Sequence, residues 1–379
     1  MTQAQRSRRY LQLLTEVLLS PGSRLADSPA IQDRAAPGSE ACSHDALEIV
    51  RNMSQEELLE LKAFAMRNHV IVRAFGLLAP ILEAQGNPRA AESIRLSILD
   101  ESTRIRQALG FLNEMCSTLE AGGHPVIVIK SLDHWPDLGS DLDLYTASDP
   151  AGIVDVMRKK FNATLAERSW GDRLANKWNF IVPGLPELVE LHAGRLGQTG
   201  EQTAITQSLR DRACNKEIDS FSFRMPAPED RIVISTLQRM YRHFYIRLCD
   251  IVDNLRLLDE AMVDFDYLQK LGSPAGLWDG IATYVTIISD YAAESRGYGV
   301  SMPARVGKSA KVRLDRIRLR GDFLRIPILP QSLALYAGEL KTLFMRGEFV
   351  NGFRLSLLPG LATAAALEYE LTGSDKGIW

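Results

Sequence analysis

The sequence predicts an α+β fold that is mostly helical, with one small mixed sheet between two helical regions. Apolar residues recur at helical spacing over most of residues 46–123 and again after residue 226. Between these regions, residues 125–129 (PVIVI) form a short β-branched run one residue after a Gly-Gly break, which is typical of a buried strand. The predicted domains are an N-terminal helix and linker (1–45), an N-terminal helical region (46–123), an α/β core (124–225) and a C-terminal helical domain (226–379).

The composition is that of a globular protein and excludes several other classes. Hydrophobic residues make up 46% of the 379 residues and charged residues 24%, so the chain can bury a large core without cross-links. The net charge of −3 argues against a protein that mainly coats nucleic acid. No apolar run approaches the roughly 18 residues of a membrane span. Four scattered cysteines lack the spacing of a zinc site, which indicates reduced thiols and a cytoplasmic location.

Start and stop signals place the helices of the N-terminal part. Ser54 and Glu57 have the spacing of a capping box, in which each side chain hydrogen-bonds a backbone N–H at the start of a helix. Residues 21–45 are rich in Ser, Pro, Ala and Gly, which predicts a linker. Helices are predicted at residues 5–20, from Ser54 onward, at 70–84 and at 88–121.

The core and the C-terminal region follow the same reasoning. After the first strand, further strands are predicted at 142–146, 178–182 and 188–192, with a helix at 150–161. C-terminal helices are predicted at 228–246, 247–262, 264–271, 276–294, 331–346 and 350–371. Between them, residues 305–325 carry eight cationic side chains and only two acidic ones. This stretch is either a solvated basic face or a surface for an anionic partner.

Asp141 and Asp143 are the strongest candidates for a metal site. Side chains alternate along a strand, so both carboxylates point to one face while Leu142 and Leu144 point to the other. Two carboxylates on one face repel each other unless a cation lies between them, and Mg²⁺ prefers such oxygen ligands. Gly139 and Ser140, just before the pair, provide a small turn that can approach a phosphate. The alternative is a strand end with solvated aspartates.

Glu190 and His192 extend this candidate site. They share one face of the strand at 188–192, while Val189 and Leu191 share the other. If this strand lies beside the strand of Asp143, Glu190 completes a three-carboxylate cluster that can bind metal or act as a general base. The alternatives are an edge strand with a polar outer face and a structural, hydrogen-bonded histidine.

The segment from Val126 to Tyr145 resembles the core motif of the nucleotidyltransferase superfamily, in which a strand, a small-residue turn and an Asp-x-Asp strand follow one another. More narrowly, the layout resembles the poorly characterised bacterial nucleotidyltransferase family 5. The matching segments are Ile129-Lys130-Ser131, Asp141-Leu142-Asp143-Leu144, Glu190-Leu191-His192 and Arg247-Leu248-Cys249-Asp250, within residues 55–300. The chain departs from the family at Ser131, where the family has the glycine that lets a helix N-terminus approach the triphosphate.

The resemblance implies Mg²⁺-dependent, or Mn²⁺-dependent, transfer of a nucleotidyl group from an NTP to a small-molecule or carrier-linked acceptor. The implied roles fall on residues that match the motif. They are metal binding and catalysis by Asp141, Asp143 and Glu190, nucleotide binding by Lys130, Ser131, Gly139 and Ser140, and substrate binding by His192, Arg247 and Asp250.

Two other functions remain open at this stage. Ser131 favours a nucleotidyltransferase fold that has lost catalysis and serves as a binding or scaffold protein. A nucleic-acid-modifying enzyme such as a terminal transferase is the third hypothesis, but it is not favoured, because the basic stretch at 305–325 lacks interleaved aromatic residues.

Overall fold

The computed structural model describes residues 2–19, 44–261, 263–361 and 363–364. The fold is α+β and mostly helical, as the sequence predicts. Part of the predicted linker and the end of the helix predicted at 350–371 lie outside the described residues. Among the helices within the described ranges, none is both long and apolar enough to cross a membrane.

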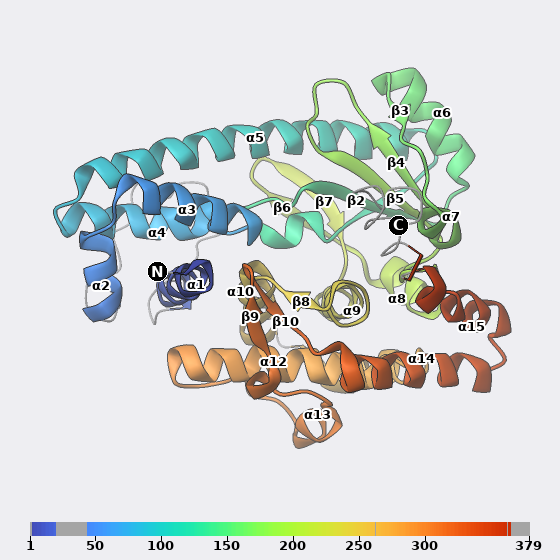
Figure 1. Ribbon diagram of the computed structural model, residues 1–379. Coiled ribbons are helices and arrows are strands. Elements are labelled where there is room, and N and C mark those ends of the chain that lie inside the picture. The colour runs from blue at the N-terminus through green and yellow to red at the C-terminus, as the bar shows by residue number, and fades with distance from the viewer. Residues whose placement is uncertain (1, 20–43, 262, 362, 365–379) are drawn as a thin grey trace.

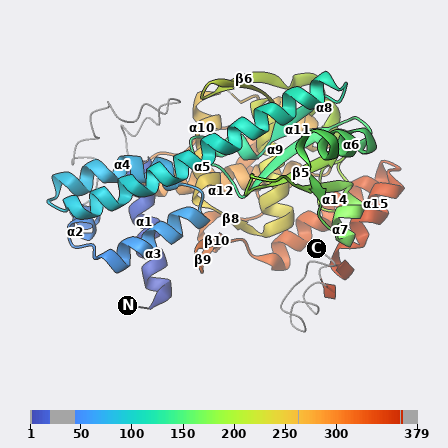
Figure 2. The same ribbon diagram turned by 90° about the horizontal axis from the view of Figure 1, so that it is seen from above.

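The N-terminal helices confirm the sequence signals closely. They are α1 (Gln3–Leu19), α2 (His44–Arg51), α3 (Gln55–Arg67), α4 (Ile71–Ala84) and α5 (Pro88–Ala121). The capping box forms at the start of α3, where Ser54 and Glu57 each hydrogen-bond the other's backbone N–H. The 34 residues of α5 span roughly 50 Å. This helix runs from the N-terminal helices to the sheet (Figures 1 and 2).

A five-stranded mixed sheet forms the centre of the predicted core. Its strand order is β1 (Val126–Ile129), β2 (Asp141–Thr146), β5 (Leu188–Ala193), β4 (Lys177–Ile181) and β3 (Thr164–Leu165). The pairing of β2 with β5 is parallel and the other pairings are antiparallel. Helix α6 (Pro150–Phe161) has the predicted bounds and supplies part of the crossover between β2 and β5. The parallel pairing sets Asp143 opposite Glu190.

The C-terminal helices pack below the sheet in the view of Figure 1. Helices α9 and α10 lie between the sheet and α12, and both contact α12. After β5 the structure contains α8 (Ala204–Arg212), α9 (Pro228–Thr236), α10 (Leu248–Glu260), α11 (Phe265–Gly272), α12 (Trp278–Arg296), α13 (Ala304–Ser309), α14 (Leu333–Met345) and α15 (Phe349–Ser356).

Several short elements are missing from the sequence prediction. One is α7 (Trp170–Ala175) and another is the hairpin of β6 (Cys214–Ile218) and β7 (Phe221–Met225), which packs against β1. A small sheet pairs β8 (Tyr245–Ile246) with β10 (Phe323–Arg325), which also pairs with β9 (Arg318–Arg320). The basic stretch is therefore partly a β-hairpin.

The helix predicted over 228–246 is wrong at its end. The α-helix stops at Thr236 and continues as a π-helical segment, Leu237–His243. Phe244 then takes a left-handed backbone conformation with a φ of 53°, and the chain enters β8. The pairing of β8 with a strand about eighty residues later overrides the local helical pattern, which is a tertiary effect that periodicity does not register.

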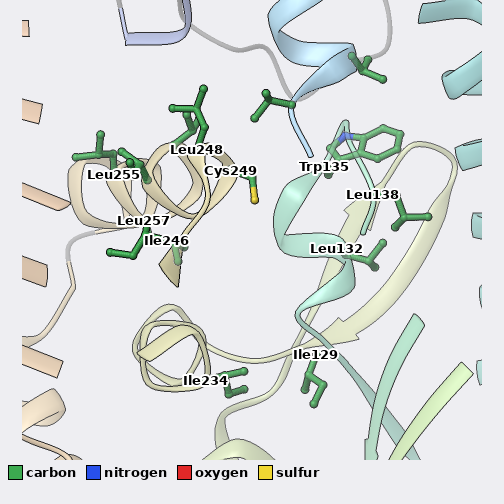
Figure 3. Close-up of a cluster of buried hydrophobic side chains, with 14 of the residues drawn as sticks. Ile129, Leu132, Trp135, Leu138, Ile234, Ile246, Leu248, Cys249, Leu255 and Leu257 are labelled. Atoms are coloured by element: carbon green, nitrogen blue, oxygen red, sulfur yellow. The ribbon is translucent and has the colours of Figure 1, made fainter. Parts of the chain in front are cut away.

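The loop between β1 and β2 is clamped by apolar and polar contacts. Its short 3₁₀ helix, Ser131–His134, places Leu132 in the cluster of buried side chains that also contains Trp135 and, from α10, Leu248 (Figure 3). Asp137 in the same loop is buried and accepts hydrogen bonds from the backbone N–H groups of Val72 and Arg73. The loop is therefore fixed to both helical regions.

Arg73 of α4 connects the N-terminal helices to the β1–β2 loop and to α10. Its guanidinium is buried and donates to Asp137 Oδ2 at 2.8 Å and to Asp253 of α10. His134 contacts the other oxygen of Asp253. Burial raises the pKa of Asp137 to about 6, although Arg73 and the two backbone N–H groups oppose this shift. One side chain thus links α4, the β1–β2 loop and α10.

We predict that Arg73→Met lowers the free energy of unfolding by about 3–5 kcal/mol, because buried Asp137 loses its cation and buried Asp253 keeps only His134 as a partner. Arg95→Met is the matched control, since Arg95 forms an exposed ion pair with Glu83 and its loss costs less than about 1 kcal/mol. Urea unfolding of the three proteins measures both changes. Equal, small losses of unfolding free energy in the two variants would contradict a stabilising role of the buried Arg73 contacts.

Candidate active site

The candidate site lies where β1, β2, β5 and β4 adjoin. Asp143 and Glu190 are opposite each other on the parallel strands β2 and β5, and His192 is two residues along β5 on the same face. Lys177 on β4 is the register partner of His192. Lys130 directly follows β1. Four neighbouring strands therefore each supply a titratable side chain to one face of the sheet.

Three of these side chains have the spacing of a metal-binding group. Asp143, Glu190 and His192 each offer a ligand atom, and these atoms lie within 4.8 Å of one another. His192 Nε2 is 2.7 Å from Glu190 Oε1 and 3.4 Å from Asp143 Oδ1. Asp141 is exposed and is not part of this compact group. The structure thus brings together Asp143 and Glu190, as expected, but with His192 in the place expected for Asp141.

Two lysines neutralise the carboxylates. Lys130 Nζ forms an ion pair with Asp143, and it lies 3.5 Å from Glu190 Oε1 and 3.3 Å from His192 Nε2. Lys177 Nζ is 2.6 Å from Glu190 Oε2. The ammonium group of Lys130 therefore contacts the same three side chains that could hold a metal ion. A cation bound there must displace it.

The charges of the cluster shift its pKa values in opposite directions. Burial alone would raise the pKa of Glu190, but Lys177, Lys130 and His192 outweigh it and hold this pKa well below its usual range. Burial likewise opposes the charged form of Lys130, yet Asp143 and Glu190 raise its pKa. Glu190 and Lys130 are thus both stabilised as ions. Glu190 is a poor proton acceptor in this state.

The pKa of Asp141 shifts in the opposite direction from that of Glu190. Although Asp141 as a whole is solvent-exposed, partial loss of water around its carboxylate, followed by the negative charges of Asp143 and Glu190, raises its pKa to about 6. A carboxylate that titrates near neutral pH is better suited to accept a proton than one with an ordinary pKa. Asp141 is therefore the more suitable general base, a role that the sequence pattern assigns to Glu190.

Ser131 and the small-residue turn have ordinary structural explanations. The buried hydroxyl of Ser131 accepts a hydrogen bond from the backbone N–H of Asp143 at 2.6 Å and donates one to the carbonyl of Ile129. It ties β1 to β2, so this hydroxyl is engaged within the chain. Gly139 has no positive φ, and a Cβ atom there would meet only ordinary contacts. Ser140 is exposed beside Asp141.

Arg247 and Asp250 form hydrogen bonds and ion pairs with each other and with neighbouring residues. Asp250 is buried, caps the start of α10 by accepting from the backbone N–H of Arg247 at 2.7 Å, and lies 2.8 Å from Arg239 Nε. The guanidinium of Arg247 contacts His69 Nε2 at 2.8 Å and donates to the hydroxyl of Tyr245. These contacts stabilise the start of the helix, and they do not include the carboxylates of the sheet.

Two cations that act on the site are absent from the residues predicted for it, Lys177 and Arg242. Burial and then the positive charge of Arg242 lower the pKa of Lys177, although Glu190 opposes the shift. Arg242 is half-buried in the π-helical segment, and its charge also acts on Lys130. The alternation of Lys177 and Asn179 with Trp178 and Phe180 was the available signal for the first lysine.

The basic stretch at 305–325 is less cationic than its composition indicates. Arg305, Lys311 and Arg313 form ion pairs with Asp266, Asp279 and Asp290. Surface pairs of this kind reduce the charge that an anionic partner meets. An anionic partner for this stretch stays a prediction.

The chain matches no family model, no curated protein and no solved structure. A functional assignment must therefore be drawn from the motif and from the geometry of the site.

Asp141→Asn should stabilise the protein at about pH 8 but not at about pH 4. The pKa of Asp141 is raised in the folded state, so its contribution to stability is greatest below the ordinary pKa of an aspartate. That contribution is lost as pH rises through about 6, where the folded-state carboxylate ionises. Thermal melts across this range measure the effect. Asp155→Asn, at an exposed position of α6, is the control, and an equal gain there would refute the prediction.

Lys130→Met should strengthen binding of Mn²⁺ by about tenfold, equivalent to about 1.4 kcal/mol, because the competing ammonium group is removed. Calorimetric titration of the metal alone measures this affinity. Lys159→Met is the control, since Lys159 pairs with Asp155 on the exposed side of α6. An unchanged or weaker affinity in Lys130→Met would show that Lys130 does not occupy the cation position.

Proposed function

We propose that this protein transfers a nucleotidyl group from an NTP to a hydroxyl-bearing small molecule or carrier-linked acceptor, in a Mg²⁺-dependent or Mn²⁺-dependent reaction. The observation that carries the proposal is the parallel pairing of β2 with β5, which sets Asp143 opposite Glu190 beside His192. This arrangement agrees with the Asp-x-Asp strand and the later acidic strand of the motif.

The residues fit a divalent cation. Asp143 and Glu190 offer carboxylate oxygens and His192 offers an imidazole nitrogen, a donor set that suits Mn²⁺ and is compatible with Mg²⁺ at the oxygens. A cation bound by these residues would neutralise negative charge on the phosphate groups during transfer. Lysines pair with both Asp143 and Glu190, and they help to hold the pKa of Glu190 well below its usual range, which keeps this carboxylate an anion as a metal ligand requires.

The other charged side chains of the site can act on the phosphate groups and on the attacking hydroxyl without a metal ion. Lys130, once released from Asp143, is a mobile point charge for a phosphate. Lys177 offsets the charge of Glu190, and the charge of Arg242 acts on both lysines, so a polyanionic ligand would meet a cluster whose carboxylates are already balanced by cations. Asp141, at the edge of the cluster with its pKa of about 6, can accept the proton of an attacking hydroxyl.

A second function is favoured by the same lysine. Because Lys130 contacts Asp143, Glu190 and His192 together, the cluster is neutralised without metal, as expected for a fold that has lost catalysis and serves as a binding or scaffold protein. Ser131, which ties the strands instead of leaving room for a phosphate, agrees with it. Calorimetric titration with Mg²⁺ and each NTP separates the two functions, since a lapsed site binds neither.

Asp143→Asn and Glu190→Gln should each lower metal-dependent pyrophosphate release from an NTP by about a hundredfold or more, because charge stabilisation by a bound metal is worth several kcal/mol. Asp155→Asn should leave the rate unchanged, since this exposed carboxylate lies on α6. A coupled pyrophosphate assay with each NTP and either metal measures the rates. Full activity in Asp143→Asn would refute the proposed site.

A further inference from the structure

Helix α15 exposes an unusual number of large apolar side chains. Phe349 is 64% exposed, Val350 67% and Phe353 63%, whereas Gly352 and Leu355 are buried. The helix lies at the outer edge of the molecule in both views of the chain (Figures 1 and 2). Isolated exposed apolar residues are common, but a group of them marks a surface with a partner.

The exposed and buried residues lie on different faces of the helix. At about 100° per residue, Phe349, Val350, Phe353 and the following Leu357 fall within an arc of about 100°. Gly352 and Leu355 point away from this arc, and Gly352 packs against the ring of Phe344 from α14. Helix α15 therefore has one apolar face for the protein and a second apolar face in solvent.

The end of α14 extends the second face. The rings of Phe344 and Phe349 are 6.2 Å apart, and Met345 is 76% exposed. We call these side chains the α15 patch. It consists of Phe344, Met345, Phe349, Val350, Phe353 and Leu357.

The charges around the α15 patch are mostly positive. Lys341 and Arg346 are exposed on α14 and the turn after it, and Arg354 lies at the edge of the patch on α15. Glu348 is the acidic side chain nearest in sequence to the patch. It forms an ion pair with Arg346 at 3.4 Å and accepts a hydrogen bond from the amide of Asn351 at 3.0 Å. Glu339, the other acidic residue of these two helices and their turn, is buried. These side chains therefore carry three positive charges and one negative charge, with Arg346 paired to the carboxylate and Arg354 half-buried.

We propose that the α15 patch docks on the surface of an anionic lipid membrane. Phenylalanine and methionine side chains on one face of a surface helix enter the boundary between headgroups and acyl chains, and neighbouring Lys and Arg side chains attract anionic headgroups. A second copy of the chain fits this patch less well. In a symmetric pair the same face meets itself, so a patch with a positive net charge would face a second patch of the same sign.

This inference is independent of nucleotidyl transfer, because none of the residues in the patch belongs to the candidate active site. On this proposal the α15 patch holds the chain at a lipid surface through side chains of one helix face.

Flotation of the full-length protein with vesicles tests the proposal. The protein should float with vesicles of phosphatidylcholine and phosphatidylserine, much less with phosphatidylcholine alone, and less again as salt is raised. Phe349→Ser with Phe353→Ser should weaken this binding by about tenfold or more. Lys341→Glu with Arg346→Glu should abolish the preference for anionic lipid.

The matched control is Leu96→Ser with Leu99→Ser, which removes two exposed leucines from α5. It should float like the unmodified protein. Binding to neither vesicle, equal binding to both, or equal loss in the control overturns the proposal. So does a dimer, measured by light scattering without lipid, that the Phe349 and Phe353 substitutions convert to a monomer, since a second copy is then the occupant.

Discussion

The buried guanidinium of Arg73 constrains the geometry of the whole site. It binds Asp137 in the β1–β2 loop and Asp253 in α10, while backbone N–H groups at the start of α4 bind Asp137 as well. Because the loop is held at this point, the residues before it have a defined path. Lys130 and Ser131 leave β1 in an orientation that lets one pair with Asp143 and the other bind its backbone. The contacts of Arg73 therefore help to position the Asp143–Glu190–His192 cluster, although Arg73 itself is not part of that cluster.

The part of the site that the sequence predicts is the part that depends on local alternation. Asp141 and Asp143 share a face because a strand repeats every two residues, and the same rule places Glu190 with His192. Their meeting depends on the pairing of two strands separated by about forty residues. The resemblance to the nucleotidyltransferase motif implied this strand pairing, whereas periodicity did not. Lys177 enters through an antiparallel register with β5, which no local pattern specifies.

In the fold as a whole, too, locally determined features are predicted from the sequence and those that depend on distant partners are not. Helices with clear caps and stops, such as α3, α5 and α6, have nearly the predicted bounds because capping residues and Pro act locally. The hairpin of β6 and β7 and the small sheet of β8, β9 and β10 were missed, because short strands are stabilised by their partners rather than by their own composition. The π-helical segment was also missed, and with it the electrostatic effect of Arg242 on both lysines.

The ammonium group of Lys130 has a consequence for how the protein matures. Many metal-binding clusters are assembled only when the ion arrives, because their carboxylates repel one another until then. Here the repulsion between Asp143 and Glu190 is cancelled by side chains of the same polypeptide. The cluster can therefore fold completely in a cell that is short of divalent cations. Under the proposed function, metal occupancy of the site would follow the supply of free metal, whereas the abundance of the folded protein would not.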